Sequence, residues 1–383
     1  MNKPKLIRIT TIPESLRGLL KGQLRFMSDH YHVIGVCSPG EAANEVIANE
    51  GVPMVYIPLT RTISPIADLK SLWAMYRFFK KEKPLIVHSH TPKAGTIGMI
   101  AAKLAGVPVR LHTVAGLPLV EVTGFKRKIL DVVEKITYRC ATKVYPNSFG
   151  LRDIILQNNY ANSNKVKVIG NGSSNGINLE FFTPEHYDVA FKTDFLKSMG
   201  VTEHDFVYLF VGRIVKDKGI NELVAAFKNV NSKFENTKLI LVGRYENELN
   251  PILNETALEI KNNTSIIEVG FQKEVRPYFY SSDVLVFPSY REGFPNVVLQ
   301  AGAMGLNAIV SDINGCNEIV QDGETGFIVP RKNSELLQIA MEKVYVNHNK
   351  NQEMGRKAKA LIQSKYNQNI VWNKILEEYQ SYK

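Results

Sequence analysis

Short apolar runs rich in β-branched residues alternate with amphipathic helical patterns along almost the whole chain, and this alternation restricts the fold more than any other feature. Four runs lie in the first half and five in the second: 5–10, 32–37, 84–90 and 109–114, then 206–212, 238–243, 265–270, 284–289 and 307–311. Nearly continuous apolar strands that alternate with helices predict parallel sheets covered on both faces. Two such series in 383 residues predict two doubly wound α/β domains.

The domain boundary is expected in the polar stretch 183–200, which follows the Asn-, Gly- and Ser-rich run 170–178. We therefore predict a first domain over residues 1–185 and a second over 186–364. A closing helix, about 365–383, is expected to pack back on the first domain. Open α/β sheets bind ligands at the carboxyl ends of their strands, so two such domains facing each other would form a binding cleft there.

The net charge of +10 belongs entirely to the N-terminal half. Residues 1–190 carry 24 Lys and Arg against 14 Asp and Glu, whereas the remainder carries 23 of each. This asymmetry indicates an anionic partner for one domain. Nucleic acid is not expected, because the chain has no zinc-finger spacing, RNP aromatic signature or basic zipper.

An anionic membrane surface fits the charge better, because Lys and Arg recur on two amphipathic segments, 66–83 and 125–143. The alternative is that both segments are ordinary helices that pack one face on a sheet. No apolar stretch approaches about 18 residues, and the start of the chain has no secretory pattern. The three widely spaced cysteines make no disulfide framework. We expect a cytoplasmic protein, peripheral on the inner face of the plasma membrane.

The first candidate site is the loop GRIVKDKG, residues 212–219, which leads from a strand into a helix. Arg213 can grip phosphate oxygens with two nitrogens, Lys218 adds a mobile charge, and the helix N-terminus favours an anion. These residues predict a diphosphate site. A solvated basic turn is the alternative.

The second candidate is the segment 290–305, which follows the strand 284–289. Pro295 suits the first helical turn, because a proline has no N–H to satisfy there. The backbone amides nearby would point at a ligand, and Glu292 could orient sugar hydroxyls. Alternatively, Glu292 only interacts with the helix dipole.

Five segments in this order resemble motifs of the retaining glycosyltransferases of family 4, which have the GT-B fold with two Rossmann-like domains facing across a cleft. The resemblance covers most of the chain and rests on RLHTVAG (110–116), VIGNGSSNGINLEFF (168–182), GRIVKDKG (212–219), PSYREGFPNVVLQA (288–301) and DINGCNEIVQDGETGFIV (312–329).

The resemblance implies a role for each matching residue. Arg213 and Lys218 would hold the donor diphosphate, and Glu292 would contact the transferred sugar. His112 would lie beside that sugar as a second catalytic residue. The remaining donor-binding residues would be Gly212, Gly293, Phe294, Pro295, Asn296 and Gln300. The acceptor side would include Ser15, Leu16, His90 and Asn171.

The family is generally metal-independent, and this chain has no Asp-x-Asp triplet. The resemblance therefore implies no cofactor and no metal, so that the Arg/Lys pair and the helix dipole neutralise the leaving diphosphate. Retention is usually pictured as attack on the same face of the sugar, with the leaving phosphate accepting the proton. This picture accounts for the lack of an obvious pair of catalytic carboxylates.

The chain departs from the family pattern at Gln300, where the family has a second Glu that binds the nucleotide ribose. Glutamine keeps an acceptor but loses the charge, a change of about 1 kcal/mol per hydrogen bond. We expect weaker or altered donor binding. The loop after the first strand also departs, because it offers Gly18 and Gly22 instead of a glycine pair.

Three other patterns are interpreted as incidental. His88 and His90 form an H-x-H that could suggest a metal, but no third ligand lies nearby in sequence. The run 170–176 narrowly misses a nicotinamide fingerprint and follows no clean strand-to-helix turn. Cys316 is expected to be a packing residue and not a nucleophile.

We therefore predict a membrane-associated retaining glycosyltransferase that moves a hexose or N-acetylhexosamine from a nucleotide-diphosphate sugar, first of all UDP-N-acetylhexosamine. The acceptor would be a sugar on a polyprenyl-diphosphate carrier, in the assembly of capsule, O-antigen or another surface glycan. The likeness of residues 88–118 to N-acetylhexosaminyl transferases that act on such lipids supports this acceptor. Two alternatives are a UDP-N-acetylhexosamine epimerase of GT-B shape, which would convert donor without acceptor, and a non-catalytic binder of nucleotide sugars, which Gln300 suggests.

Overall fold

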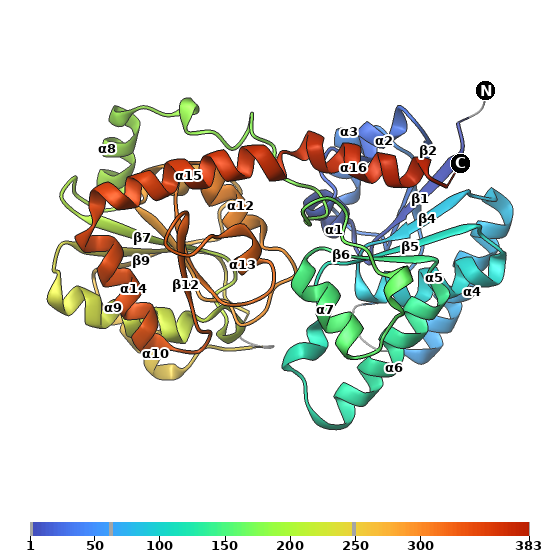
Figure 1. Ribbon diagram of the computed structural model, residues 1–383, viewed down its shortest axis with the longest axis horizontal. Coiled ribbons are helices and arrows are strands. Elements are labelled where there is room, and N and C mark those ends of the chain that lie inside the picture. The colour runs from blue at the N-terminus through green and yellow to red at the C-terminus, as the bar shows by residue number, and fades with distance from the viewer. Residues whose placement is uncertain (1–2, 61–63, 247–249, 383) are drawn as a thin grey trace. The chain divides into compact units, whose positions relative to one another are not determined.

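The computed structural model describes residues 3–60, 64–246 and 250–382 and divides the chain into two compact units (Figure 1). Unit 1 consists of residues 1–176 together with 369–383, and unit 2 of residues 177–368. Each unit contains one six-stranded sheet in which every strand pair is parallel. The predicted fold class, two doubly wound α/β domains, is confirmed.

The unit 1 sheet has the strand order β3-β2-β1-β4-β5-β6. Its strands are β1 (Lys5–Ile9), β2 (His32–Cys37), β3 (Met54–Tyr56), β4 (Ile86–Ser89), β5 (Val109–Val114) and β6 (Lys143–Pro146). Alternate residues of β1 point to opposite faces, so Ile7 and Ile9 enter one hydrophobic core while Leu6 enters another. The sheet is therefore buried on both sides, which explains its nearly continuous apolar strands.

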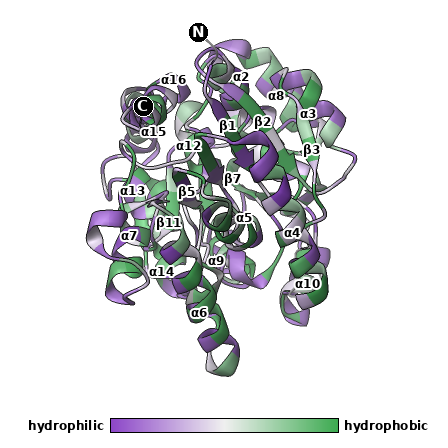
Figure 2. Cartoon of the chain, turned by 90° about the vertical axis from the view of Figure 1, so that its right-hand side faces the viewer, coloured by the Kyte–Doolittle hydropathy of each residue, from purple (hydrophilic) through white to green (hydrophobic). Residues whose placement is uncertain are grey.

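Helices cover both faces of this sheet. They are α1 (Pro13–Leu19), α2 (Gln23–Ser28), α3 (Ala43–Glu50), α4 (Pro65–Glu82), α5 (Pro92–Ala105), α6 (Gly124–Cys140) and α7 (Phe149–Gln157), with α16 (Gln368–Gln380) from the end of the chain. Figure 2 shows the largely hydrophobic ribbon of α5 and the mixed character of α6. Because α5 packs between the sheet and the helices α4 and α6, most of its surface is buried.

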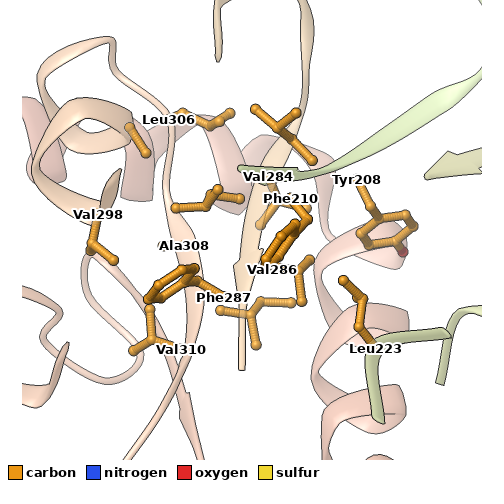
Figure 3. Close-up of a cluster of buried hydrophobic side chains, with 14 of the residues drawn as sticks. Tyr208, Phe210, Leu223, Val284, Val286, Phe287, Val298, Leu306, Ala308 and Val310 are labelled. Carbon is orange, nitrogen blue, oxygen red and sulfur yellow. The ribbon is translucent and has the colours of Figure 1, made fainter. Parts of the chain in front are cut away.

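The unit 2 sheet has the strand order β12-β11-β10-β7-β8-β9. Its strands are β7 (Phe206–Val211), β8 (Thr237–Val242), β9 (Ile266–Gly270), β10 (Val284–Phe287), β11 (Ala308–Ser311) and β12 (Gly326–Val329). Its helices are α8 (Val189–Ser198), α9 (Ile220–Lys233), α10 (Asn254–Asn262), α11 (Arg276–Ser281), α12 (Asn296–Ala303), α13 (Cys316–Ile319), α14 (Ser334–Val346) and α15 (His348–Tyr366). Figure 3 shows side chains of the central strands, among them Phe210, Val286 and Phe287, packed against Leu223 of α9 and Val298 of α12.

The nine predicted strands are all present, and the three strands that the prediction missed are β3, β6 and β12. Each of them lies at an edge of its sheet and has three or four residues. Edge strands are often short and covered on fewer sides, so their apolar pattern is weaker, although the edge strand β9 was predicted.

The predicted domain boundaries need correction. Unit 2 begins at Ile177, not at residue 186, because Ile177 forms a parallel bridge with Asn367 and its N–H donates to the Tyr366 carbonyl at 2.8 Å. Phe182 also packs against the unit 2 core. The predicted second domain ended at residue 364, whereas unit 2 extends to residue 368.

The helix α16 belongs to unit 1, where its buried face includes Val371, Ile375 and Tyr379. These side chains complete the core beneath α1 and α2, so the end of the chain closes a domain that begins at its start. With this assignment unit 1 carries 26 Lys and Arg against 13 Asp and Glu, whereas unit 2 carries 21 against 24. In the described part of the chain no helix is both long and apolar enough to cross a membrane.

We expect Ile375→Ala to lower the free energy of unfolding of unit 1 by about 2 to 5 kcal/mol, because a buried isoleucine leaves a cavity in the core that α16 completes. The measurement is urea unfolding followed by tryptophan fluorescence, since the only two tryptophans, Trp73 and Trp372, both lie in unit 1. The exposed Asn373→Ala on the same helix is the control and should change the value by less than about 0.5 kcal/mol. Equal effects of the two substitutions would contradict the packing of α16 described here.

Candidate functional site

Two predicted loops of unit 2 meet at the carboxyl ends of β7 and β10. These strands are direct neighbours, and the strand order reverses between them. The loop after β7 contains Gly212, whose N–H donates to the Val242 carbonyl at 2.9 Å, and a short 3-10 turn, Lys216–Lys218. The loop after β10 runs through Glu292 into α12. A reversal of strand order is where open α/β sheets bind ligands.

Gly219 allows the two loops to touch. Its φ of +72° is left-handed, and a Cβ atom there would lie 2.1 Å from the carbonyl oxygen of Pro288. The N–H of Tyr290 donates to the Asp217 carbonyl at 2.8 Å, and the Ser289 hydroxyl donates to the same oxygen at 3.2 Å. A glycine is therefore needed where the first motif ends, because any side chain would separate the loops.

Lys218 and Glu292, which are 74 residues apart in sequence, form an ion pair between Nζ and Oε1. Both side chains are largely buried, with 17% and 16% of their surface exposed. The Ser289 hydroxyl donates to the same carboxylate oxygen at 2.8 Å, and the Lys218 ammonium lies 5.2 Å from the Phe287 ring centroid. The structure thus places two predicted site residues in direct contact, each with its charge balanced.

Arg213 is more exposed than Lys218 and also holds a carboxylate. Its Nη1 lies 2.5 Å from Oε2 of Glu246, in the loop after β8. The side chain of Arg213 is 47% exposed, so its remaining donors face solvent. An anion that binds Arg213 and Lys218 therefore has to compete with Glu246 and Glu292.

The helix α12 begins at Asn296, so Pro295 is its N-cap and not a residue of its first turn as predicted. The φ of −75° at Pro295 suits a helix, but its ψ of 110° is extended, which moves the start of the helix by one residue. The first N–H groups of a helix have no acceptor within the helix, so α12 directs donors toward the loop of Gly293. Gln300 is half-buried in the second turn.

The loop after β11 supports this helix start. The Asn314 side-chain amide donates to the backbone carbonyl of Glu292. Phe294 is buried and packs on Tyr366 with ring centroids 5.3 Å apart, so it is its backbone that remains to face a ligand. Cys316 is fully buried, and burial raises the pKa of its thiol well above the ordinary value, as expected of a packing residue.

In unit 1 a histidine cluster lies at the carboxyl ends of β4 and β5. His112 is 3% exposed, and its Nδ1 is hydrogen-bonded to the Ser89 hydroxyl at 2.8 Å. Burial lowers the pKa of His112 to about 4, against a smaller opposing effect of a backbone hydrogen bond at Ser89. Gly95 in the first turn of α5 lies directly against this ring, since a Cβ atom there would be 2.3 Å from Cε1. His112 is therefore a neutral, fixed ring near pH 7.

His90 belongs to a buried network that was not predicted from the sequence. Arg8 donates from Nε to His90 Nε2 at 3.0 Å and from Nη2 to the Gln23 side chain. Because His90 Nε2 accepts, Nδ1 carries the hydrogen. That atom and Arg8 Nη1 are buried with no hydrogen-bond partner among the residues that the structure describes. Burial, together with His88, Arg8 and His112, lowers the pKa of His90 well below its ordinary value.

His88 is tied to the end of the chain instead of to a metal. Its Nδ1 is hydrogen-bonded to the Tyr379 hydroxyl of α16 at 2.5 Å and its Nε2 to the Thr113 hydroxyl at 2.7 Å. Within the described ranges no three His, Cys, Asp or Glu side chains are grouped so that they could hold a metal ion. Arg8 within an apolar strand was the one visible signal of this network, because a charge there needs buried partners.

The other three residues expected on the acceptor side are less well placed. The Leu16 side chain is 1% exposed and packs in the core with α16, so only its backbone can face a ligand. Ser15 is half-buried on α1, and Asn171 is exposed in the loop before the unit boundary.

Comparisons with known proteins agree with this architecture. Residues 191–361 match the family described as "Glycosyl transferases group 1", and residues 23–172 match the "Glycosyl transferase 4-like domain". The chain is 35% identical over its whole length to the "Capsular polysaccharide biosynthesis glycosyltransferase CapM" of Staphylococcus aureus, of which it covers 98%.

Two further similarities extend over most of the chain. It is 32% identical to the "UDP-Gal:alpha-D-GlcNAc-diphosphoundecaprenol alpha-1,3-galactosyltransferase" of Escherichia coli, over 73% of this chain and 72% of that relative. The crystal structure of HepE from Anabaena in complex with UDP and glucose aligns with a TM-score of 0.84 at 16% identity, covering 99% of this chain and 100% of that one. At 16% identity, the similarity to HepE is evidence for the fold alone.

The buried histidines predict a pH dependence of stability. Because the folded pKa of His112 is about 4, the unfolded chain binds a proton at this residue between pH 6.5 and 4 that folded unit 1 does not. Stability is therefore full above pH 6.5 and falls as the pH is lowered. From pH 7 to pH 5 His112 alone should remove about 2 kcal/mol, with His88 and His90 acting in the same direction.

Urea unfolding followed by tryptophan fluorescence at these two pH values measures the loss. His112→Gln should show a shallower dependence than the wild type, whereas the exposed His32→Gln in the same unit should match the wild type. An unchanged dependence in His112→Gln would mean that this ring is not held neutral by burial.

Proposed function

The chain belongs to the group 1 glycosyl transferases, family 4 with the GT-B fold, and from this premise we propose that it transfers a sugar from a UDP-sugar to a sugar on a polyprenyl-diphosphate carrier. The observation that carries the proposal is the contact of Lys218 with Glu292 beside the start of α12, at the switch point where the loop of Arg213 also begins. The transferred sugar is a hexose or N-acetylhexosamine, with N-acetylhexosamine preferred. The product is a precursor of capsule or another surface polysaccharide.

The donor diphosphate is assigned to unit 2. Arg213 offers several N–H donors in one plane, Lys218 offers a mobile ammonium, and the first amides of α12 add the positive end of the helix dipole. When Lys218 turns to a phosphate oxygen, Glu292 keeps the Ser289 hydroxyl and has its other oxygen for a sugar hydroxyl. The carboxylates of Glu246 and Glu292 hold Arg213 and Lys218 in place until the diphosphate binds to the two cations.

The transfer step needs charge stabilisation more than a strong base. The bond between the anomeric carbon and the diphosphate oxygen breaks, and the acceptor hydroxyl oxygen bonds to the same face of that carbon. The hydroxyl proton passes to the leaving phosphate, whose growing negative charge Arg213 and Lys218 neutralise. Neutral His112 supplies a fixed hydrogen bond to a sugar hydroxyl and does not take up the proton, because burial keeps its pKa near 4.

Two observations support the lipid-linked acceptor. Unit 1 contains twice as many Lys and Arg as Asp and Glu, which suits a diphosphate and an anionic membrane surface. The relative from Escherichia coli is named for an acceptor on diphosphoundecaprenol, and the relative from Staphylococcus aureus for capsular polysaccharide. The similarity to the Staphylococcus aureus relative covers the whole chain and so includes unit 1, which is the half that takes the acceptor in this proposal.

We expect Arg213→Ala to weaken UDP binding about 10- to 100-fold, because a charge-assisted contact to the diphosphate is lost. The measurement is thermal stability against UDP, GDP and ADP, in which a saturating ligand raises the melting temperature of the wild type. Arg244→Ala is the matched control, since Arg244 is an exposed neighbour of the same Glu246. Sugar transfer from UDP-N-acetylglucosamine, UDP-N-acetylgalactosamine and UDP-galactose to a polyprenyl-diphosphate sugar should fall in parallel.

Two results would overturn this assignment. A melting shift that survives unchanged in Arg213→Ala would move the diphosphate elsewhere. Conversion of the UDP-sugar without any acceptor, and no transfer with one, would indicate an epimerase instead of a transferase.

Gln300→Glu should lower the Michaelis constant for the donor about 5-fold, because a charged acceptor strengthens one hydrogen bond to the ribose by about 1 kcal/mol. The turnover number should change little, since the ribose does not react. Initial rates over a range of donor concentrations give both quantities. Gln321→Glu, an exposed glutamine of unit 2, controls for the added charge alone. A higher donor Michaelis constant in Gln300→Glu would show that this chain is built for the neutral side chain.

A further inference from the structure

An apolar groove of about 400 Å³ runs over α5 between α4 and α6 of unit 1. Ten of its fourteen lining residues are aliphatic or proline, so its interior is poorly suited to a polar ligand. Leu72 of α4, Ile100 of α5 and Val133 of α6 line three sides of it. α5 contacts both neighbouring helices, and Figures 1 and 2 show the three helices at one side of unit 1. The volume is that of a small-molecule site.

Large apolar residues of the same helices are exposed. Leu69, which lines the groove, shows 66% of its surface. Ile66 and Trp73, also of α4, show 76% and 59%, and Phe125 of α6 shows 80%. An ordinary helix packed on a sheet does not leave its large apolar residues open in this way. The sequence could not distinguish the two interpretations of these amphipathic segments, and the exposure favours the one in which they meet an apolar partner.

One end of the groove lies at the first turn of α5. Lys93 and Thr96 line it there, and Gly95 of the same turn lies against the His112 ring. From this end the groove follows α5 away from His112 toward Ile100. A ligand in it can therefore place a head group at Lys93, at the start of α5, while its tail leaves along the face of α5 that is turned toward α4 and α6.

The charges around the groove match a ligand with an anionic head. Residues 64–140, which include all three helices, carry 13 Lys and Arg against 5 Asp and Glu. Lys93 stands at the end nearest His112 and is balanced by Asp68, with Nζ and Oδ2 2.5 Å apart. The third charged lining residue, Glu134, is buried, and burial raises the pKa of its carboxyl.

We propose that this groove holds the first isoprene units of the acceptor's polyprenyl chain, with the acceptor diphosphate at the first turn of α5 beside Lys93. The inference rests on the proposed function and adds the place of the lipid to it. An isoprenoid chain fits because it is entirely apolar, as the groove is, and is joined directly to a diphosphate, which suits the basic character of the segment that holds the three helices. The exposed apolar residues of α4 and α6 then face the bilayer from which the chain is drawn.

The test compares ligands that share a diphosphate and differ in chain length. Inorganic diphosphate, dimethylallyl diphosphate with one isoprene unit and farnesyl diphosphate with three are titrated calorimetrically into the full chain without detergent, below the micelle concentration. The wild type should bind farnesyl diphosphate about tenfold or more tighter than dimethylallyl diphosphate, because each buried methylene adds to the affinity.

Two adjacent residues of α6 supply a matched pair of variants. Val133→Trp fills the groove and should reduce the preference for the longer chain to less than about twofold, since the added ring occupies the space of the second and third units. Val132→Trp places the same ring on the exposed side of the same helix and should leave the preference unchanged. Ile100→Trp fills the groove from α5 and replaces Val133→Trp if that variant does not fold by tryptophan fluorescence.

Three results would overturn the proposal: no chain-length preference in the wild type, an unchanged preference in both filled variants, or an equal loss in Val132→Trp. Binding to vesicles of anionic phospholipid that Val132→Trp and Val133→Trp weaken alike, with the farnesyl preference intact in both, would mean that the face only docks on the bilayer. Because these titrations need no donor, they separate the two claims. Chain-length-dependent binding without any sugar transfer would contradict the proposed function and leave the groove as a prenyl site, whereas transfer without chain-length dependence would do the reverse.

Discussion

Both candidate sites depend on one constraint of parallel sheets: all strands end at the same edge, and the loops diverge where the strand order reverses. In unit 1 the reversal lies between β1 and β4, and in unit 2 between β7 and β10. Side chains that leave neighbouring strands at this point lie close together, however far apart they are in sequence. The contact of Lys218 with Glu292 in unit 2 and that of Arg8 with His90 in unit 1 both arise in this way.

The two sites nevertheless differ in their electrostatics. In unit 2 each cation is matched by a carboxylate, and in the proposed reaction a phosphate takes the place of that carboxylate. In unit 1 the histidines are buried without a carboxylate partner close by, and their pKa values are lowered, so they are neutral hydrogen-bonding groups. A site for a charged leaving group needs the first arrangement, and a site that positions sugar hydroxyls is served by the second.

The sequence allowed much of the fold to be predicted, because apolar runs and helical periods are local patterns. All nine expected strands are present, whereas β3, β6 and β12, three edge strands of three or four residues, were missed. Arg213 and Lys218 share one loop, and Glu292 follows a recognisable strand. Arg8, Gln23 and Tyr379 were missed because their roles come from partners 15 to 291 residues away.

What the sequence by itself determined is therefore most of the elements, the basic character of the first half and the two loops that contain Arg213, Lys218 and Glu292, since each depends on neighbours within a few positions. The tertiary structure decided the rest. It places the unit boundary at residue 177 and packs α16 into the core of unit 1. It also buries His88, His90 and His112, and this burial lowers the pKa of each ring so that the neutral form is favoured. Apolar residues of α4 and α6 remain exposed in it. An amphipathic pattern predicts that one face of a helix is apolar, but only the packing of the whole domain determines what covers that face.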